Sequence, residues 1–219
     1  MSDLKQTVRQ SIDHIFASHT DIFHEYEELI LCNGQWGAAG FASPAPDYVK
    51  RGTLVRNSLK DTTWVETGTL FGDTTRILAN ISKHVYTIEP DVTLYNGAFD
   101  KLSTLKNVTV LNGTSEVILP DVASKISGNV CFFLDGHHSG AGTFAGPSDT
   151  PILDELNVIR KNIPRYDRVL IAIDDIRLFT GKRHIYGDYP SLDFLVDFAR
   201  SNSLRWKIEH DIFFADNEL

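Results

Sequence analysis

The chain has 219 residues, 42% of them hydrophobic and 23% charged, which is enough for one α/β domain with a large core. Its 21 Lys and Arg are outnumbered by 29 Asp and Glu, so the net charge is −8, and without a basic cluster the chain is poorly suited to bind nucleic acid. The two cysteines, Cys32 and Cys131, do not have the spacing of a zinc motif. The first residues do not resemble a signal peptide, and no stretch is apolar enough to cross a membrane. We therefore expect a cytoplasmic protein without a membrane partner.

The first part of the chain predicts two helices separated by an irregular segment. Apolar residues recur at helical spacing over residues 3–31 and again, in a shorter stretch, over residues 48–60. Residues 33–47 are rich in Gly, Ala and Pro, which disfavour regular structure, and loops of this length often serve as lids or binding loops. We therefore predict that residues 1–60 form a helical cap or lid segment and that residues 61–219 form the main domain.

From residue 62 onward, short apolar runs alternate with helical patterns. This alternation indicates right-handed crossovers and a Rossmann-like α/β fold, in which a mostly parallel seven-stranded sheet carries helices on both faces. The last two strands are joined by too few residues for a crossover, so we expect them to form a closing antiparallel hairpin. Strands are predicted at residues 63–67, 84–89, 108–111, 130–135, 168–174, 206–210 and 212–215, and helices at residues 73–82, 93–102, 115–126, 151–163 and 191–201.

In such a sheet ligands bind where the strands end, and the first strand ends in a turn with two glycines, Gly68 and Gly72. Glycine lets a ligand approach the backbone, and the free N–H groups of the following helix attract an anion such as a carboxylate. Glu66 can accept from an ammonium group, so acid and turn together suit an amino-acid moiety better than a pyrophosphate. An ordinary tight turn with Asp73 as the helix cap is the alternative. The candidate ligand-binding residues here are Glu66, Thr67, Gly68, Thr69, Gly72, Thr74 and Thr75.

Polar residues also follow the next two strands. Glu89, at the end of the second strand, lies where a carboxylate can bind both ribose hydroxyls of an adenosine. Gly113, Thr114 and Ser115, after the third strand, can border an adenine ring. Capping of the following helices explains the same residues without a ligand, so both interpretations are open at this point.

Together these three strand ends resemble the class I S-adenosylmethionine-dependent methyltransferases. The stretch Glu66 to Gly72 matches the E/D-x-G-x-x-x-G turn with which that family binds the methionine part of its cofactor. Glu89 matches the family's ribose-binding acid, and Gly113 to Ser115 match its adenine-side loop. The resemblance covers residues 62 to about 217, closing hairpin included. It implies the family's fold and S-adenosylmethionine as cofactor, and says little about the substrate.

Acids and histidines gather at the ends of the fourth and fifth strands. Asp135 follows the fourth strand, with His137 and His138 just after it, and Asp174 and Asp175 follow the fifth. Neighbouring strands would bring these three carboxylates together, where they repel one another unless a cation compensates them. Mg²⁺ prefers oxygen ligands and can lower the pKa of a substrate hydroxyl. Either histidine suits the role of general base, because its ordinary pKa is about 6.5.

This pattern resembles the metal-dependent branch of the small-molecule O-methyltransferases, which includes catechol and macrolide-sugar enzymes. That branch carries an Asp after the fourth strand and Asp-Asp or Asp-Asn after the fifth, which implies that Asp135, Asp174 and Asp175 bind the metal. The catechol enzymes have a lysine base where this chain has His138, so the base differs. We also place Asp135 among the cofactor-binding and catalytic residues. We interpret three further acids as capping and surface residues: Asp149, Asp154 and Glu155.

The sequence thus predicts transfer of the methyl group of S-adenosylmethionine to a small-molecule hydroxyl, as in a sugar, a polyketide or peptide metabolite, or a catechol, with help from a divalent metal. A metal-independent N-methyltransferase that uses His137 or His138 is the first alternative. A nicotinamide-dependent oxidoreductase is disfavoured by the glycine spacing and the closing hairpin. A cofactor-binding partner subunit without activity fits the same residues, and the sequence permits a homodimer.

Overall fold

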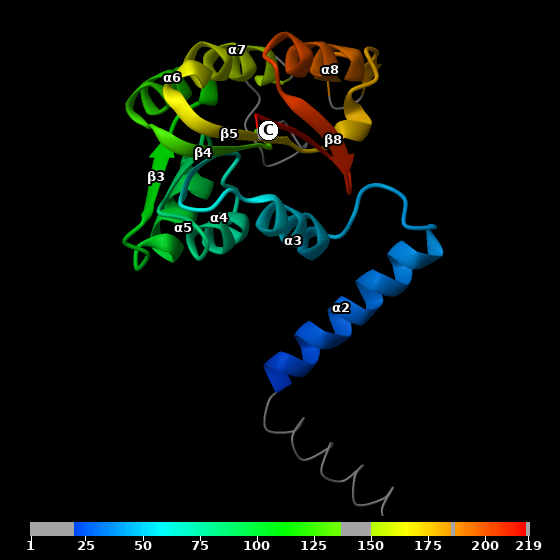
Figure 1. Ribbon diagram of the computed structural model, residues 1–219. Helices are drawn as coiled ribbons and strands as arrows, with labels where there is room; N and C mark the ends of the chain where they lie inside the picture. Colours follow the sequence, from blue (N-terminus) through cyan, green and yellow to red (C-terminus); the bar gives the residue numbers. More distant parts are fainter. Residues whose placement is uncertain (1–19, 137–149, 185–186, 218–219) are drawn as a thin grey trace, which may run out of the picture. The chain divides into compact units, whose positions relative to one another are not determined.

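The computed structural model describes residues 20–136, 150–184 and 187–217, and the chain divides into two units, residues 1–46 and 47–219 (Figure 1). The division falls before α3 (Asp47–Asn57), so this helix belongs to the same unit as the sheet. The lid function of the N-terminal segment stays a prediction. Among the described residues, no helix is long and apolar enough to cross a membrane.

The first unit contains α2 (Thr20–Ala38). The segment that we predicted to be irregular, residues 33–47, is therefore helical in its first part, and the prediction is wrong there. Single glycines cost a helix only about 1 kcal/mol relative to alanine, which is not enough to end it. The helix ends just before Gly40, whose φ of 67° is incompatible with a further helical turn. The beginning of the predicted first helix, residues 3–19, lies outside the described residues.

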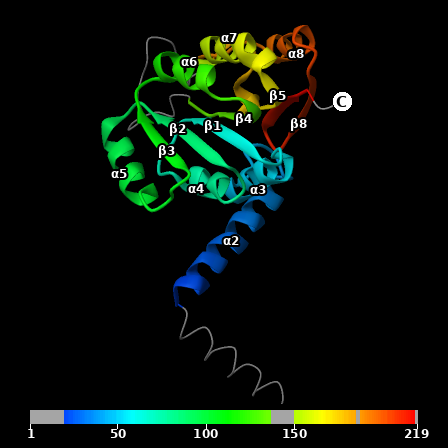
Figure 2. The ribbon, with the colours of Figure 1, turned by 60° about the vertical axis from the view of Figure 1, so that its left-hand side comes forward.

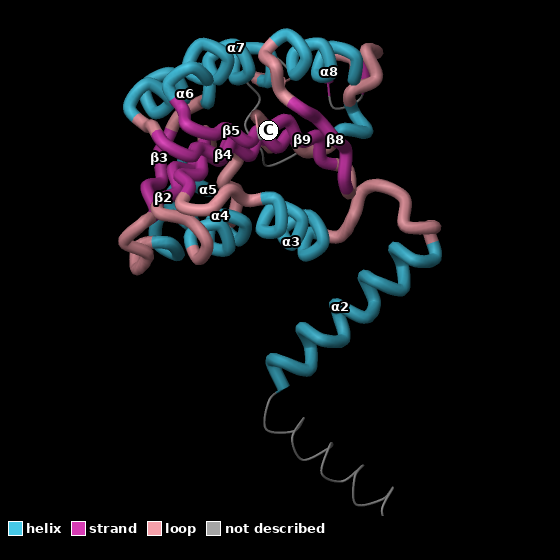
Figure 3. Tube along the Cα trace, viewed as in Figure 1, coloured by secondary structure: helices cyan, strands magenta, loops and turns pink. Residues whose placement is uncertain are grey.

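Seven strands of the second unit form one sheet in the order β3-β2-β1-β4-β5-β9-β8 (Figure 3). β1 to β5 run parallel, β9 runs antiparallel to β5, and β8 runs antiparallel to β9. This topology confirms the predicted Rossmann-like fold and its closing hairpin. The strands are β1 (Thr62–Thr67), β2 (His84–Glu89), β3 (Val108–Asn112), β4 (Gly128–Leu134), β5 (Tyr166–Ile173), β8 (Arg205–Glu209) and β9 (Ile212–Asp216), beside a separate ribbon of β6 (Arg183–His184) and β7 (Gly187–Asp188).

Helices cover both faces of this sheet (Figures 1 and 2). One face carries α3, α4 (Asp73–Ala79) and α5 (Val92–Leu102). The other carries α6 (Ser115–Lys125), α7 (Ile152–Asn162) and α8 (Leu192–Ser201). The predicted helices of the main domain are therefore confirmed, with ends that differ by a few residues.

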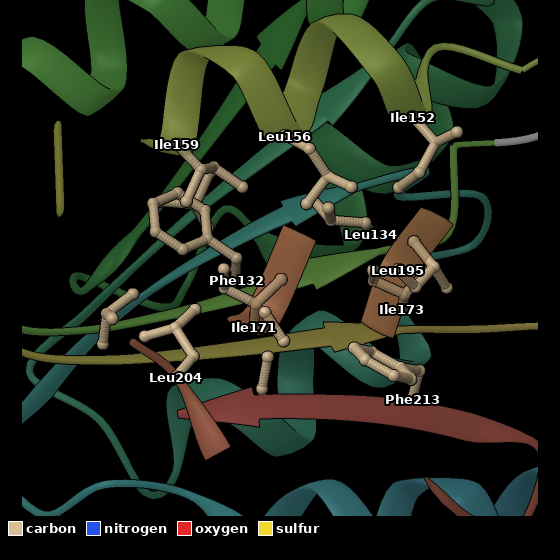
Figure 4. Packing of buried hydrophobic residues seen from close by; sticks show 14 of the residues in the cluster. Phe132, Leu134, Ile152, Leu156, Ile159, Ile171, Ile173, Leu195, Leu204 and Phe213 are labelled. Carbon is tan, nitrogen blue, oxygen red and sulfur yellow. The ribbon is translucent and has the colours of Figure 1, made fainter. Parts of the chain in front are cut away.

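The core lies in two layers because successive strand residues point to opposite faces. In β4, Phe132 belongs to the cluster under α6, α7 and α8, whereas Phe133 belongs to the cluster under α3 and α4. In the first cluster the apolar side of α7 meets the sheet, as Figure 4 shows for Ile152, Leu156 and Ile159. Each fully buried side chain of this size contributes roughly 1.5–3 kcal/mol to stability, so both clusters fix the sheet firmly.

The strand register brings the polar residues after β1, β4 and β5 to one edge. Thr67 pairs with Leu134, and Leu134 with Ile173, so these three strands end level with one another. The residues that follow continue the ladder, because the N–H of Asp135 donates to the carbonyl of Thr67 and the N–H of Asp174 donates to the carbonyl of Leu134, both at 3.1 Å. The carboxyl edge of the sheet is therefore the place to examine for a site.

Candidate functional site at the carboxyl edge of the sheet

The turn after β1 needs its two glycines for packing. Gly68 has a φ of 89°, and a Cβ there would lie 2.5 Å from the carbonyl oxygen of Asp135. Gly72 has a φ of 74°, and a Cβ there would lie 2.9 Å from Cδ1 of Leu102 on α5. The positive φ at both positions and the backbone contact at Gly68 favour glycine without any ligand, so the glycine pair by itself does not demonstrate one.

Glu66 lies beneath this turn in a network of hydroxyl groups. Its side chain is buried, and Oε2 accepts hydrogen bonds from Thr75 Oγ1 (2.5 Å) and Thr87 Oγ1 (2.7 Å). Thr87 Oγ1 in turn lies 2.6 Å from Thr69 Oγ1. Burial raises the pKa of Glu66 to about 7, although the hydrogen bonds from both threonines lower it. Thr69 and Thr75 are thus committed to Glu66 and its neighbours, and any effect of theirs on a cofactor would pass through this network.

Two further threonines of the predicted turn have different surroundings. The hydroxyl of Thr74 accepts from Nε of Arg51 on α3, at 3.3 Å. The buried hydroxyl of Thr67 has no hydrogen-bond partner in the part of the chain that the structure describes. A Cβ added to Gly136 would lie 3.2 Å from that hydroxyl and 3.5 Å from Oε1 of Glu155, so Thr67 and Glu155 face the same short stretch after β4.

Glu89 is held at the end of β2 by two backbone groups. Its Oε2 accepts from the N–H of Leu70 in the glycine turn (2.9 Å), and its Oε1 accepts from the N–H of Asp91 (3.0 Å). Burial raises its pKa, and the same two hydrogen bonds oppose that rise. Each carboxylate oxygen can accept two hydrogen bonds, so each retains one acceptor position for a ligand.

The predicted adenine-side residues form the connection from β3 to α6. Thr114 is the N-cap residue of α6, although its side chain accepts no capping hydrogen bond from the described backbone, and Ser115 is buried. The N–H of Gly113 donates to the carbonyl of Glu89 at 3.1 Å. This connection therefore lies beside the predicted ribose acid, as a cofactor that spans both strand ends would require.

The two acids after β5 share one ammonium group. Lys50 Nζ on α3 lies 2.8 Å from Asp174 Oδ2 and 3.1 Å from Asp175 Oδ1. Burial lowers the pKa of Lys50, but the charges of Asp174 and Asp175 outweigh burial and raise it overall. Burial, together with the charge of Asp135, raises the pKa of Asp174, and Lys50 opposes that rise. Two of the three carboxylates expected here, Asp174 and Asp175, lie together, and the chain itself supplies a cation between them.

A second cation lies on the far side of Asp175. Arg177, in the short helical turn Ile176–Leu178, donates from Nη1 to Asp175 Oδ1 (2.5 Å) and also pairs with Asp211. Asp211 comes from the turn between β8 and β9 and is buried. One carboxylate oxygen from each of Asp174, Asp175 and Asp211 lies within 4.8 Å of the others. Asp211 therefore joins the acidic group that the sequence motif indicated.

The remaining predicted residues follow β4. Asp135 is partly buried, and its charge acts on Asp174, Glu66 and Glu155. The candidate bases His137 and His138 lie outside the described residues, as does Asp149. Their roles stay predictions.

Glu155 corrects the sequence analysis, which interpreted it as a surface or capping residue. Its side chain is buried, and its Oε1 has no hydrogen-bond partner among the described residues. Burial raises its pKa to about 7, although the neighbouring hydroxyls of Ser115 and Thr67 oppose that rise. The helical spacing of Ile152, Leu156 and Ile159 marks the buried side of α7, and Glu155 lies on that same side. That spacing could have indicated from the sequence that Glu155 is buried.

The cations of the site have no counterpart among the residues predicted from the sequence. Lys50 lies 124 and 125 residues before its two partners, and Arg177 lies 34 residues before Asp211. Ion pairs between such distant residues leave no local pattern. Only the fold, which lays α3 beside the end of β5, brings Lys50 to the acids.

Solved structures share this fold. No family model matches the chain, and no curated protein matches it in sequence. The 23S rRNA methyltransferase ErmE superposes with a TM-score of 0.51 at 16% identity, over 79% of this chain and 69% of its own. The methyltransferase domain of bacterial CtHen1 gives 0.50 at 12% identity, over 78% and 98%. An rRNA methylase from Streptococcus thermophilus gives 0.47 at 15% identity, over 80% and 96%. On the strength of the first two, this chain has the fold of the class I S-adenosylmethionine-dependent methyltransferases.

Proposed function

We propose that the chain transfers the methyl group of S-adenosylmethionine to a hydroxyl oxygen of a small molecule. The observation that carries this proposal is Glu89, a carboxylate held by the backbone at the end of β2 with acceptor positions left for a ribose diol. The methyltransferase fold and the loop of Gly113 to Ser115 beside Glu89 support the same cofactor. Two hydrogen bonds to Oε2 of Glu66 leave its Oε1 to accept from the cofactor's ammonium group, directly or through water.

The chemical step needs little more than alignment. The acceptor oxygen attacks the methyl carbon in line with the sulfur, and holding two reactants in that geometry contributes about 7 kcal/mol or more. Asp135 lies between the cofactor turn and the acids of β5, since its carbonyl faces Gly68 and its charge acts on Asp174. We assign the acceptor to this side, with His138 or His137 as the base.

A small acceptor fits the charge of the chain better than RNA does. The net charge is −8, which disfavours binding to a phosphate backbone. ErmE is named as a 23S rRNA methyltransferase, so RNA belongs in the acceptor screen as the competing outcome.

The divalent metal expected with this function does not fit the acids as they stand. The oxygens of Asp174, Asp175 and Asp211 are close enough to bind one cation. However, Lys50 pairs with the first two, and Arg177 pairs with the last two. A metal held by all three acids would have to displace both cations, and one held by Asp174 and Asp175 alone would have to displace Lys50, so we derive no step through it. Sensitivity of turnover to a chelator tests the metal directly.

A screen with labelled cofactor tests the proposal. The chain is incubated with methyl-labelled S-adenosylmethionine and sugars, polyketides, peptides, catechols, amines or structured RNA, with and without chelator. We expect label in a hydroxyl acceptor, and mass spectrometry should identify a methyl ether. Asp174→Asn should reduce turnover, whereas Asp167→Asn, an exposed acid at the opposite end of the same strand, should not. A labelled amine or RNA would overturn the acceptor, and absence of S-adenosylhomocysteine binding in calorimetry would overturn the function.

A further inference from the structure

Lys50 is held at the acceptor side by a well-anchored helix. Leu54 of α3 is buried in the cluster that also contains Trp64 of β1. Next to Lys50, Arg51 donates to Thr74 on α4, and at the end of the helix Asn57 donates to Glu209 on β8 (3.2 Å). The position of Lys50 is therefore set by the packing of α3.

The ammonium group of Lys50 is itself largely buried. Its side chain is 14% exposed, and those of Asp174 and Asp175 are 5% and 8% exposed. A lysine ammonium has three N–H donors, and Asp174 and Asp175 take two of them. Among the described residues, no partner takes the third. A buried cation with a donor to spare, next to the proposed acceptor position, can bind an oxygen.

We propose that Lys50 is a catalytic residue that supplies the positive charge of the acceptor side in place of a divalent metal. The inference rests on the proposed function. Asp174 and Asp175 hold the ammonium group, and its third N–H donates to the acceptor oxygen. A hydrogen bond from a cation stabilises the negative charge that develops on that oxygen, which is also what a bound metal would do.

The reaction balances without a metal or a further reactant. The acceptor O–H proton passes to the general base, and the freed electron pair forms the new O–CH₃ bond. The S–CH₃ bond breaks at the same time, and its electron pair stays on sulfur, which leaves neutral S-adenosylhomocysteine. Lys50 remains protonated throughout, because it donates a hydrogen bond and not a proton.

Lys50 and a divalent cation exclude one another at these acids. Both require the same carboxylate oxygens of Asp174 and Asp175, and Arg177 already shares Oδ1 of Asp175, so a divalent cation beside Lys50 would be a third positive centre at these buried acids. If Lys50 is the resident cation, removing its charge should open the position to a metal. This exchange distinguishes the proposal from a lysine that only stabilises the fold.

Binding of Mn²⁺ to the full chain with S-adenosylhomocysteine, followed by electron paramagnetic resonance, tests the exchange. We expect that the wild-type chain binds no Mn²⁺ that depends on Asp174, and that Lys50→Met binds one ion. Asp174→Asn in the Lys50→Met background should remove that ion. Lys106→Met, which removes an exposed lysine, should behave as wild type. Asp174-dependent Mn²⁺ binding by the wild-type chain would overturn the proposal even if Lys50→Met failed to fold, and a folded Lys50→Met that binds no Mn²⁺ would contradict it.

Turnover gives the second arm of the test. Lys50→Met should lower kcat about 100-fold or more, the scale for losing a group that stabilises developing charge, while affinity for S-adenosylhomocysteine changes less than about twofold. Lys50→Arg, which keeps the charge, should recover part of kcat. Full turnover in Lys50→Met would refute the catalytic role. If the wild-type chain methylates no acceptor, the proposed function fails, whereas the Mn²⁺ measurement still decides whether Lys50 holds a cation position.

Discussion

At the scale of single residues, Glu89 gives the most specific prediction about ligand binding. Glu89→Gln keeps an oxygen for one of the two backbone N–H groups and presents an amide donor in place of the second acceptor. We expect affinity for S-adenosylhomocysteine to fall about 10- to 100-fold, the scale for losing hydrogen bonds to a charged group. Calorimetry measures this, with Asp100→Asn on the exposed side of α5 as the control.

The ribose assignment has a second check in the ligand. A 2′-deoxy analogue should bind the wild-type chain more weakly than the parent compound does, because one hydrogen bond to Glu89 is absent. It should lose little further affinity in Glu89→Gln, since both changes remove the same interaction. Fully additive losses would show that another residue binds the diol.

Glu155 gives a prediction about pH. Burial raises its pKa from 4.5 to about 7. An acid with a higher pKa in the folded than in the unfolded chain stabilises the fold fully below the unfolded value, and this contribution is lost as the pH rises through the folded value. Glu155→Gln avoids that loss because its amide stays neutral. The variant should therefore exceed the wild type in free energy of unfolding at pH 8, by on the order of 2 kcal/mol, and this gain should shrink toward pH 5.

Urea unfolding at pH 5 and pH 8 measures the effect of Glu155→Gln. Glu66 also has a raised pKa, but it is present in both proteins, so its contribution cancels in the difference. Asp154→Asn, which removes an exposed acid of the same helix, serves as the control. A gain in Glu155→Gln that does not vary with pH would show that Glu155 ionises with an ordinary pKa.

At the scale of elements, the two glycines of the turn after β1 have different neighbours, so an added side chain should have a different effect at each. A Cβ on Gly68 meets a backbone carbonyl oxygen at 2.5 Å, whereas a Cβ on Gly72 meets the flexible end of Leu102 at 2.9 Å. Both alanine variants also carry the strain of positive φ, roughly 1–3 kcal/mol. We therefore expect Gly68→Ala to destabilise the fold more than Gly72→Ala, because β4 would have to move away from β1. Urea unfolding compares them, and equal losses would contradict this account of the turn.

The elements were predictable because their signals are local. Short continuous apolar runs marked β4 and β5, and the polar residues directly after them marked the site edge. The continuation of α2 past residue 33 was not predictable from its glycines. The free energy by which a glycine destabilises a helix is small, and whether it ends the helix depends on the residues around it. The ion pairs of Lys50 were hidden because they depend on the placement of α3 against the sheet. The burial of Glu155 could have been predicted, because it follows from the helical spacing of the apolar residues of α7.

At the scale of the whole molecule, the position of the boundary between the two units can be tested with fragments. Every member of both core clusters lies in residues 47–219, as do all the described residues of the candidate site. We expect a fragment of residues 47–219 to fold and to bind S-adenosylhomocysteine with the affinity of the full chain. Circular dichroism, thermal unfolding and calorimetry measure these properties.

A second fragment, residues 61–219, follows the boundary that the sequence predicted and serves as the comparison. It lacks Leu54 and Leu59, which are 1% and 7% exposed in the intact chain, and their burial is worth roughly 1.5–3 kcal/mol each. It also lacks Lys50, so Asp174 and Asp175 would be buried without their shared cation. Because a domain of this size is stable by only about 5–15 kcal/mol, these losses together should leave the shorter fragment unfolded or with a much lower Tm. If both fragments fold equally well, α3 is dispensable to the sheet, and the boundary belongs near residue 60 after all.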